Sequence, residues 1–272
     1  MSTGRFATKD GCSLAYEISG EGMHVLWQHG LGADRKQPAE VFPETDGFQR
    51  ITLECRGHGE SELGDPARLS IAQFADDVVD LFDHLDIDRL IVGGISLGAA
   101  ISVRLAATVP SRVKAQILAR PAWVYHAAPA TMKPYLLIAD LLKRFGADEG
   151  LRRCEQSEVL AEVQSISPDN AASLRSFFSR TGEESTIELL SRIPMDGPGL
   201  TAADIARIAV PTALIANREE YIHPIRYAEQ LRDLIPGSSI QIITSKSLDK
   251  SLYVSEFRAA IASFLETVEA AR

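Results

Sequence analysis

The segment LIVGGISLG, residues 90–98, decides the fold. Its first half is a short apolar run, typical of a strand buried in a parallel sheet. Its second half has the form G-x-S-x-G, with Ser96 between Gly94 and Gly98, and a helical stretch follows to about Thr108. A strand that turns so sharply into a helix strains the serine backbone and requires very small neighbours. We predict that Ser96 is a nucleophile; the plainer alternative is a glycine-rich turn that happens to contain serine.

Strand and helix patterns alternate on both sides of this segment. Short apolar strands are predicted at 24–28, 51–55, 116–119, 212–216 and 240–243, after a hairpin around Asp10-Gly11. A helix is predicted over 70–85, with Ser70 as its cap and Gln73 completing a capping box. This alternation favours an α/β fold with a mostly parallel sheet covered by helices on both faces.

The alternation fails between residues 121 and 194, where helical patches are predicted at 136–145, 157–163, 170–179 and 185–192. No strand pattern occurs in this stretch. We therefore predict a core in two parts, residues 1–120 and 196–272, interrupted by a helical cap at 121–195.

Composition excludes several classes of function. The chain has 272 residues, of which 45% are hydrophobic and 24% charged, which is typical of a globular protein. Its formal net charge of −9 argues against non-specific binding to nucleic acid or to anionic membranes. Three scattered cysteines, no N-terminal apolar segment and no membrane-length apolar run lead us to expect a cytoplasmic protein. A small-molecule substrate is expected, and nothing in the sequence indicates the oligomeric state.

A second glycine-rich loop, HGLG at residues 29–32, follows an earlier strand. An oxyanion is stabilised when two N–H groups converge on one point. We predict that the backbone amides of Leu31 and Leu97 form such a pair, the second aided by the helix N-terminus. An ordinary strand–helix turn is the alternative for HGLG. His29 is expected to brace its loop, and His58 to be a turn residue.

With HGLG, RGHGES at 56–61, GGISLG at 93–98 and a helical insertion in place, the chain resembles the α/β-hydrolase superfamily over nearly its whole length. The resemblance implies a serine hydrolase whose acid lies after the strand at 212–216. Glu220 matches the family's Asp, with Glu219 as a weaker neighbour. Asn217 stands where the family usually has Gly.

One part of the family pattern is missing, because no histidine follows residue 223. In the family the catalytic His lies after the last strand, at a position near Ser247 in this chain. His223, three residues beyond Glu220, is the tentative base, although it could simply cap the helix that Pro224 begins. Alternatively Lys246 or another group serves as base, or the protein is not an efficient serine hydrolase.

Trp123, Tyr125 and His126 lie where the chain leaves the predicted sheet for the cap, an exit that commonly lines the pocket in the family. We predict that they contact substrate, with His126 as a further candidate base; core packing is the alternative for the two aromatic residues. No histidine pair has metal-ligand spacing with a matching acid, so neither metal nor cofactor is expected.

The sequence therefore predicts a hydrolase acting on a small neutral carboxylic ester, lactone or related acyl compound. Ser96 would attack the carbonyl, Leu31 and Leu97 would stabilise the oxyanion, and Glu220 would orient His223. The alternatives are a ligand-binding member of the family with impaired catalysis, carbon–carbon bond hydrolysis, or cofactor-free peroxidation. The last is weakened because Leu97 stands where perhydrolase-type relatives usually carry Met.

Overall fold

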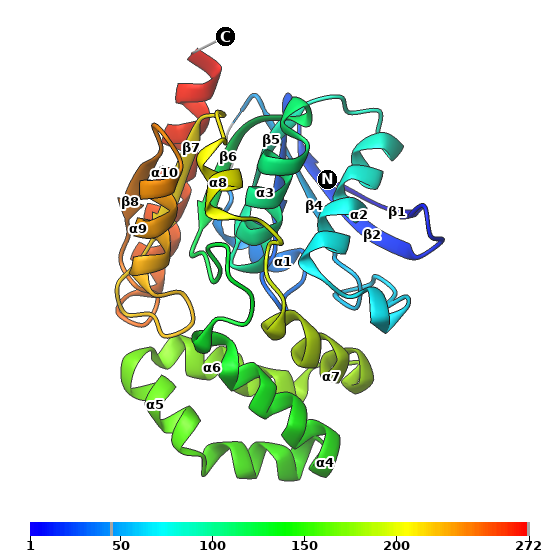
Figure 1. Ribbon diagram of the computed structural model, residues 1–272, viewed down its shortest axis with the longest axis vertical. Helices are drawn as coiled ribbons and strands as arrows, with labels where there is room; N and C mark the ends of the chain where they lie inside the picture. The colour runs from blue at the N-terminus through cyan, green and yellow to red at the C-terminus, as the bar shows by residue number, and fades with distance from the viewer. Residues whose placement is uncertain (44–45, 271–272) are drawn as a thin grey trace.

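The computed structural model describes residues 1–43 and 46–270. Within this part of the chain, eight strands form one sheet in the order β1-β2-β4-β3-β5-β6-β7-β8 (Figure 1). The strands are β1 (Ser2–Ala7), β2 (Ser13–Gly20), β3 (Met23–Gln28), β4 (Phe48–Leu53), β5 (Leu90–Ile95), β6 (Val113–Ala119), β7 (Thr212–Ala216) and β8 (Ser239–Ile242). The β1–β2 and β2–β4 pairs are antiparallel and all other pairs are parallel. The carboxyl ends of β3, β5, β6, β7 and β8 therefore meet along one edge.

Helices cover both faces of the sheet, as the alternating pattern predicted. On one face α1 (Lys36–Val41) and α10 (Lys250–Ala270) contribute to a core that includes Trp27 and Phe257. The other face carries α2 (Ile71–His84), α3 (Leu97–Thr108), α8 (Ala202–Ala206) and α9 (Ile225–Leu234). The central strands β3, β5, β6 and β7 are thus buried on both sides, which explains why they are nearly continuous apolar runs.

The cap of α2 confirms one half of the prediction and corrects the other. The Ser70 hydroxyl accepts a hydrogen bond from the Gln73 amide at 3.0 Å. The Gln73 side chain does not complete a capping box; it bonds to Arg68 and Asp77 instead. These charged partners hold the amide group along the helix and away from the cap.

The segment between β6 and β7, which lies wholly within the described residues, consists of helices and loops and contains no strand. It contains α4 (Lys133–Glu155), α5 (Glu158–Ile166), α6 (Pro168–Ser176) and α7 (Glu183–Arg192), which Figure 1 shows gathered beyond one edge of the sheet. The predicted helix end at Gly146 is a kink inside α4, where Gly146 has φ 69°. Short 3₁₀ turns complete the fold at η1 (Pro66–Arg68), η2 (Pro110–Arg112), η3 (Ala130–Met132), η4 (Phe177–Ser179) and η5 (Ile193–Met195).

Candidate active site

Ser96 lies in the sharp turn between β5 and α3. Its φ of 57° and ψ of −104° place a non-glycine residue in a strained conformation. The flanking glycines are required by close packing: a Cβ on Gly94 would lie 2.8 Å from the Gly98 Cα, and one on Gly98 would lie 2.5 Å from the Gln28 carbonyl oxygen. The G-x-S-x-G spacing therefore reflects a turn in which backbone segments touch.

The HGLG loop lies beside this turn and is held from both sides. The Gly30 amide donates to the Gln37 Oε1 atom at 2.7 Å, and the Gly32 amide donates to the His58 Nε2 atom at 2.9 Å. Among the described residues, the Leu31 amide between them has no hydrogen-bond acceptor. The Leu97 amide belongs to the first turn of α3, where N–H groups lack intrahelical partners. Neither amide is therefore committed to another acceptor within the described residues.

Two buried histidines support this loop through hydrogen bonds, and neither of them lines the cavity at Ser96. His29 accepts from the Cys55 amide through Nε2, so its Nδ1 is the donor to the Gly30 carbonyl oxygen at 2.8 Å. His58 accepts from Gly32 through Nε2 and donates through Nδ1 to the Arg56 carbonyl oxygen at 2.9 Å. Burial lowers the pKa of His29 to about 4 and that of His58 well below its usual value. Both act as neutral braces, as predicted for His29; the turn residue His58 has the same role.

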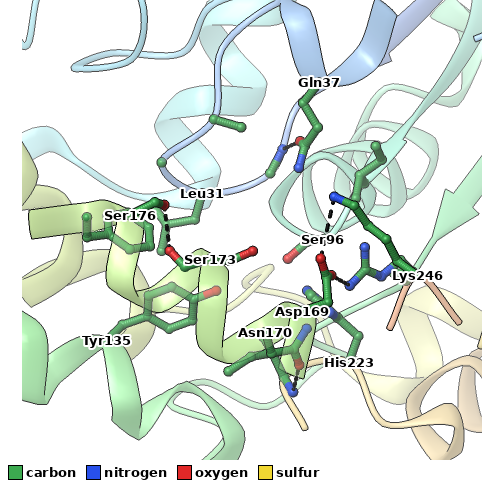
Figure 2. A pocket seen from close by; sticks show the side chains of 17 residues that line it. Leu31, Gln37, Ser96, Tyr135, Asp169, Asn170, Ser173, Ser176, His223 and Lys246 are labelled. Atoms are coloured by element: carbon green, nitrogen blue, oxygen red, sulfur yellow. Dashed lines mark hydrogen bonds and ion pairs between the residues drawn. The ribbon is translucent and has the colours of Figure 1, made fainter. Parts of the chain in front are cut away.

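A cavity of about 160 Å³ opens above Ser96, between the sheet edge and the helical segment (Figure 2). Its sheet side includes Leu31, Ser96 and His223, and its helical side includes Tyr135 and Ser173. The remaining lining residues are Gly30, Gly32, Ala33, Gln37, Ile95, Arg120, Asp169, Asn170, Ser176, Phe177, Ile222 and Lys246. Hydroxyl, amide and charged groups are numerous in this wall, so the cavity suits a small polar molecule.

The predicted acid and base meet at this cavity. His223 Nδ1 lies 3.0 Å from Glu220 Oε2, and both side chains are buried. His223 Nε2 is also buried and has no hydrogen-bond partner among the described residues. The imidazole is therefore held by a carboxylate on one nitrogen while the other is unpaired, and the residue lines the same cavity as Ser96. The alternative in which His223 merely caps α9 is not what the structure shows, because Nδ1 bonds to Glu220 and Nε2 bonds to no described group.

Two residues absent from the predicted site fix the carboxylate of Glu220. Its Oε1 atom accepts from Arg120 Nη2 at 2.5 Å and from Asn217 Nδ2 at 2.9 Å. Burial opposes ionisation, but the Arg120 charge and the hydrogen bond from His223 prevail and lower the pKa of Glu220 to about 2. Asn217, which departs from the family's Gly, thus gains a role. A charged residue directly after the apolar strand β6 was the signal for Arg120.

Comparisons with known proteins agree with this geometry. The family model for the alpha/beta hydrolase fold matches residues 24–153. The enol-lactonase from Burkholderia xenovorans superimposes with a TM-score of 0.76 at 22% identity, covering 97% of this chain and 100% of its own. The chain belongs to the α/β-hydrolase superfamily.

Two further relatives illustrate the range of the superfamily. A thermophilic esterase from Thermogutta terrifontis has a TM-score of 0.77 at 21% identity, with 98% of this chain and 99% of its own covered. A Pseudomonas syringae protein provisionally named carbamate hydrolase RutD is 25% identical over 224 residues, which is 80% of this chain and 84% of that protein. At these identities the solved structures establish the fold alone.

This α/β-hydrolase has Lys246 in the loop after β8, which is the loop that carries the catalytic histidine in the usual superfamily pattern. Lys246 lines the cavity, and its Nζ atom lies 3.5 Å from Asp169 Oδ1 on α6. Asp169 Oδ2 lies 3.5 Å from Arg120, and the Asp169 amide donates to the Ser247 hydroxyl at 3.1 Å. Figure 2 shows Asp169 between Lys246 and His223. The loop thus joins the helical segment to the sheet edge.

Three predicted substrate contacts lie outside the cavity. Trp123 is packed in the core, where its indole nitrogen donates to the Asp196 carbonyl oxygen at 2.9 Å. Tyr125 packs against the same core and lies 4.1 Å, centroid to centroid, from the ring of His126. His126 is exposed. None of the three lines the cavity at Ser96, so the structure does not support Trp123, Tyr125 or His126 as substrate contacts there.

No helix in residues 1–43 and 46–270 has both the length and the apolar character needed to cross a bilayer. No group of three or more His, Cys, Asp or Glu side chains in the same ranges has an arrangement that could hold a metal ion.

Proposed function

We propose that this α/β-hydrolase cleaves a small neutral carboxylic ester, lactone or related acyl compound through Ser96. The observation that carries the proposal is a shared cavity: Ser96 lines it together with His223, whose Nδ1 is bound to Glu220 and whose Nε2 is unpaired. A nucleophile, a base and a group that orients the base are the parts that acyl transfer to serine requires.

In the proposed reaction the Ser96 hydroxyl attacks the substrate carbonyl while His223 Nε2 accepts its proton. The transfer requires the hydroxyl to turn toward that nitrogen when substrate fills the cavity, since catalytic hydrogen bonds are often long before substrate binds. Glu220 Oε2 then faces an imidazolium, whose charge it stabilises. The amides of Leu31 and Leu97 would bind the oxyanion, and His223 would pass the proton to the leaving alkoxide, so that the alcohol is released and the acyl group stays on Ser96. A water molecule that gives a proton to His223 would then attack this acyl-serine ester, which releases the acid and restores the Ser96 hydroxyl.

The cavity also limits the substrate. Its volume of about 160 Å³ is below the range of most sites for drug-sized ligands, so a short acyl compound fits better than a long alkyl chain. Its lining contains Gln37, Tyr135, Asn170 and Ser173, which offer hydrogen bonds to polar substituents. The names of relatives, which include an esterase and an enol-lactonase, support the same bond types.

The test is hydrolysis of short chromogenic esters by the wild-type protein and by Ser96→Ala. We expect measurable turnover that falls with acyl-chain length and is lost in Ser96→Ala, by a factor on the order of 10⁴ or more. His126→Ala is the matched control because that residue is exposed and outside the cavity. Background rates for both wild type and Ser96→Ala would instead favour a ligand-binding protein.

A further inference from the structure

We infer that Arg120 is a positioning residue that aims the Glu220 carboxylate at His223. The inference rests on the proposed function, in which His223 is the base. Arg120 does not touch the reacting atoms in that scheme; it acts through Glu220. Arg120 differs from an ordinary partner in a buried ion pair because it binds one carboxylate oxygen of Glu220 and leaves the other for His223.

The backbone delivers Arg120 to this place. It follows β6 with φ 45°, and its amide donates to the Ile215 carbonyl oxygen of β7 at 2.7 Å. A positive φ is uncommon for a non-glycine residue and is maintained only where surrounding contacts fix it. This turn places the guanidinium behind the acid, where the side chain is only 8% exposed.

The guanidinium is fixed by three neighbours from different elements. Nη2 lies 2.5 Å from Glu220 Oε1, and Nη1 donates to the Tyr253 hydroxyl at 3.0 Å, with the guanidinium carbon 5.6 Å from the centre of that ring. Nη2 also lies 3.5 Å from Asp169 Oδ2 on α6. A planar fork held at both ends has little freedom to follow a rotating carboxylate.

The carboxylate of Glu220 is divided between two sets of donors as a result. Arg120 and Asn217 both bind Oε1, which leaves Oε2 for His223 Nδ1. This division compensates for the unusual spacing of the pair, because an acid and a histidine three residues apart share one short loop. Without the two donors on Oε1, the carboxylate could turn away from the imidazole.

Charged and titratable groups surround His223 from every side. Glu220 lies on its own loop, Arg120 follows β6, Asp169 belongs to α6, and Lys246 belongs to the loop after β8. Tyr135 of α4 lines the same cavity, and Tyr253 of α10 accepts a hydrogen bond from Arg120. Burial lowers the pKa of His223, Arg120 lowers it further, and the bond to Glu220 opposes both. Removal of Arg120 should therefore raise the pKa of His223 and reduce the fraction of the imidazole that is present as free base.

The experiment compares Arg120→Gln, Arg120→Lys and the control Arg50→Gln, which breaks the buried pair between Arg50 and Glu17 (2.6 Å) far from the site. The pKa of His223 is measured by NMR on histidine-labelled protein, with the signal assigned by its loss in His223→Gln. We expect Arg120→Gln to raise that pKa by about one unit or more, and Arg50→Gln to leave it unchanged.

Turnover gives the second readout. In Arg120→Gln, kcat should fall by about tenfold or more at pH 7, with KM changed little, and the acidic limb of the kcat/KM profile should move to higher pH with the His223 pKa. Arg120→Lys should restore the pKa because it keeps the charge, but only part of kcat because it lacks the fork.

A folded Arg120→Gln protein with an unchanged His223 pKa and an unchanged acidic limb would overturn the inference and leave Arg120 a structural residue. If the wild-type protein and Ser96→Ala hydrolyse acyl compounds equally, the proposed function fails, and the NMR comparison still decides whether Arg120 controls the Glu220–His223 pair. The two failures are therefore distinguishable.

Discussion

The two walls beside Ser96 are built in different ways. On the HGLG side the proposed oxyanion donors are backbone amides, and the side chains that support them, such as His58 and Gln37, bond to the loop itself. On the Glu220 side the proposed acid and base are side chains, and the acid depends on a partner from a distant part of the chain, Arg120 at 2.5 Å. The first wall follows the superfamily pattern, and the second departs from it.

The difference shows which parts of a catalytic site can change while the protein keeps its fold. A backbone donor can only be moved by reshaping a loop between a strand and a helix, which is costly in a packed sheet. A side-chain base can move to any element that ends at the same sheet edge, provided that a new set of partners orients it. In this chain the loop after β8 carries Lys246 at the cavity, and His223 lies on the loop after β7.

The largest effect is expected from removal of the proposed base. His223→Ala should lower kcat by a factor of about 10³–10⁵, and the double variant with Ser96→Ala should be hardly worse than Ser96→Ala alone, because the two residues act as a unit. Steady-state kinetics on a short ester measures both. Full activity in His223→Ala, with Ser96→Ala inactive, would show that the base lies elsewhere.

Gly32→Ala should damage the other wall by a smaller amount. Gly32 has φ 80°, and a Cβ there would collide with the ring of Phe177, which is itself buried. Displacement of the loop would move the Leu31 amide, and loss of one oxyanion donor costs about 10²–10³ in kcat. Gly11→Ala is the matched control, since Gly11 has φ 84° but meets nothing within 4 Å. Equal kcat in Gly32→Ala and wild type would argue that Leu31 does not bind the oxyanion.

The same contrast explains what could be predicted from the sequence. The turn at Ser96 and the HGLG loop depend on local glycines, so their positions follow from spacing alone. Arg120 and Asn217 act through contacts with Glu220 across 100 and 3 residues, and only the closing of β6 beside β7 brings the first of them to the acid. Trp123 and Tyr125 were expected at the pocket because the chain leaves the sheet there in the family, but the sequence does not show that both side chains pack into the core.

The pH dependence of the free energy of unfolding should distinguish the buried, neutral histidines that support the HGLG loop from a solvent-exposed histidine. The pKa of His29 is about 4 in the folded protein and 6.5 without burial, so the unfolded chain takes up the proton first as pH falls. The stability that neutral His29 contributes is therefore complete above pH 6.5 and is lost between pH 6.5 and about 4, at up to about 1.4 kcal/mol per pH unit.

Urea denaturation at a series of pH values measures this loss. His29→Gln should be less stable overall, because the Cys55 amide loses its acceptor, but its stability should fall less steeply with acid. The exposed residue offers the control: His126→Gln should keep the wild-type slope. An unchanged slope in His29→Gln would mean that folding does not lower the pKa of this imidazole.

Lys246→Met should have the smallest effect on turnover. This variant tests whether Lys246 or His223 is the base. Lys246 lies at the cavity and pairs with Asp169 at 3.5 Å, whereas His223 has a carboxylate on one nitrogen and a free second nitrogen, the arrangement of an oriented base. We therefore expect Lys246→Met to retain kcat within about tenfold of wild type, with a larger change in KM if the ammonium contacts substrate. A Lys246→Met protein as inactive as Ser96→Ala would assign the base to the lysine, since loss of a cavity contact alone does not stop proton transfer.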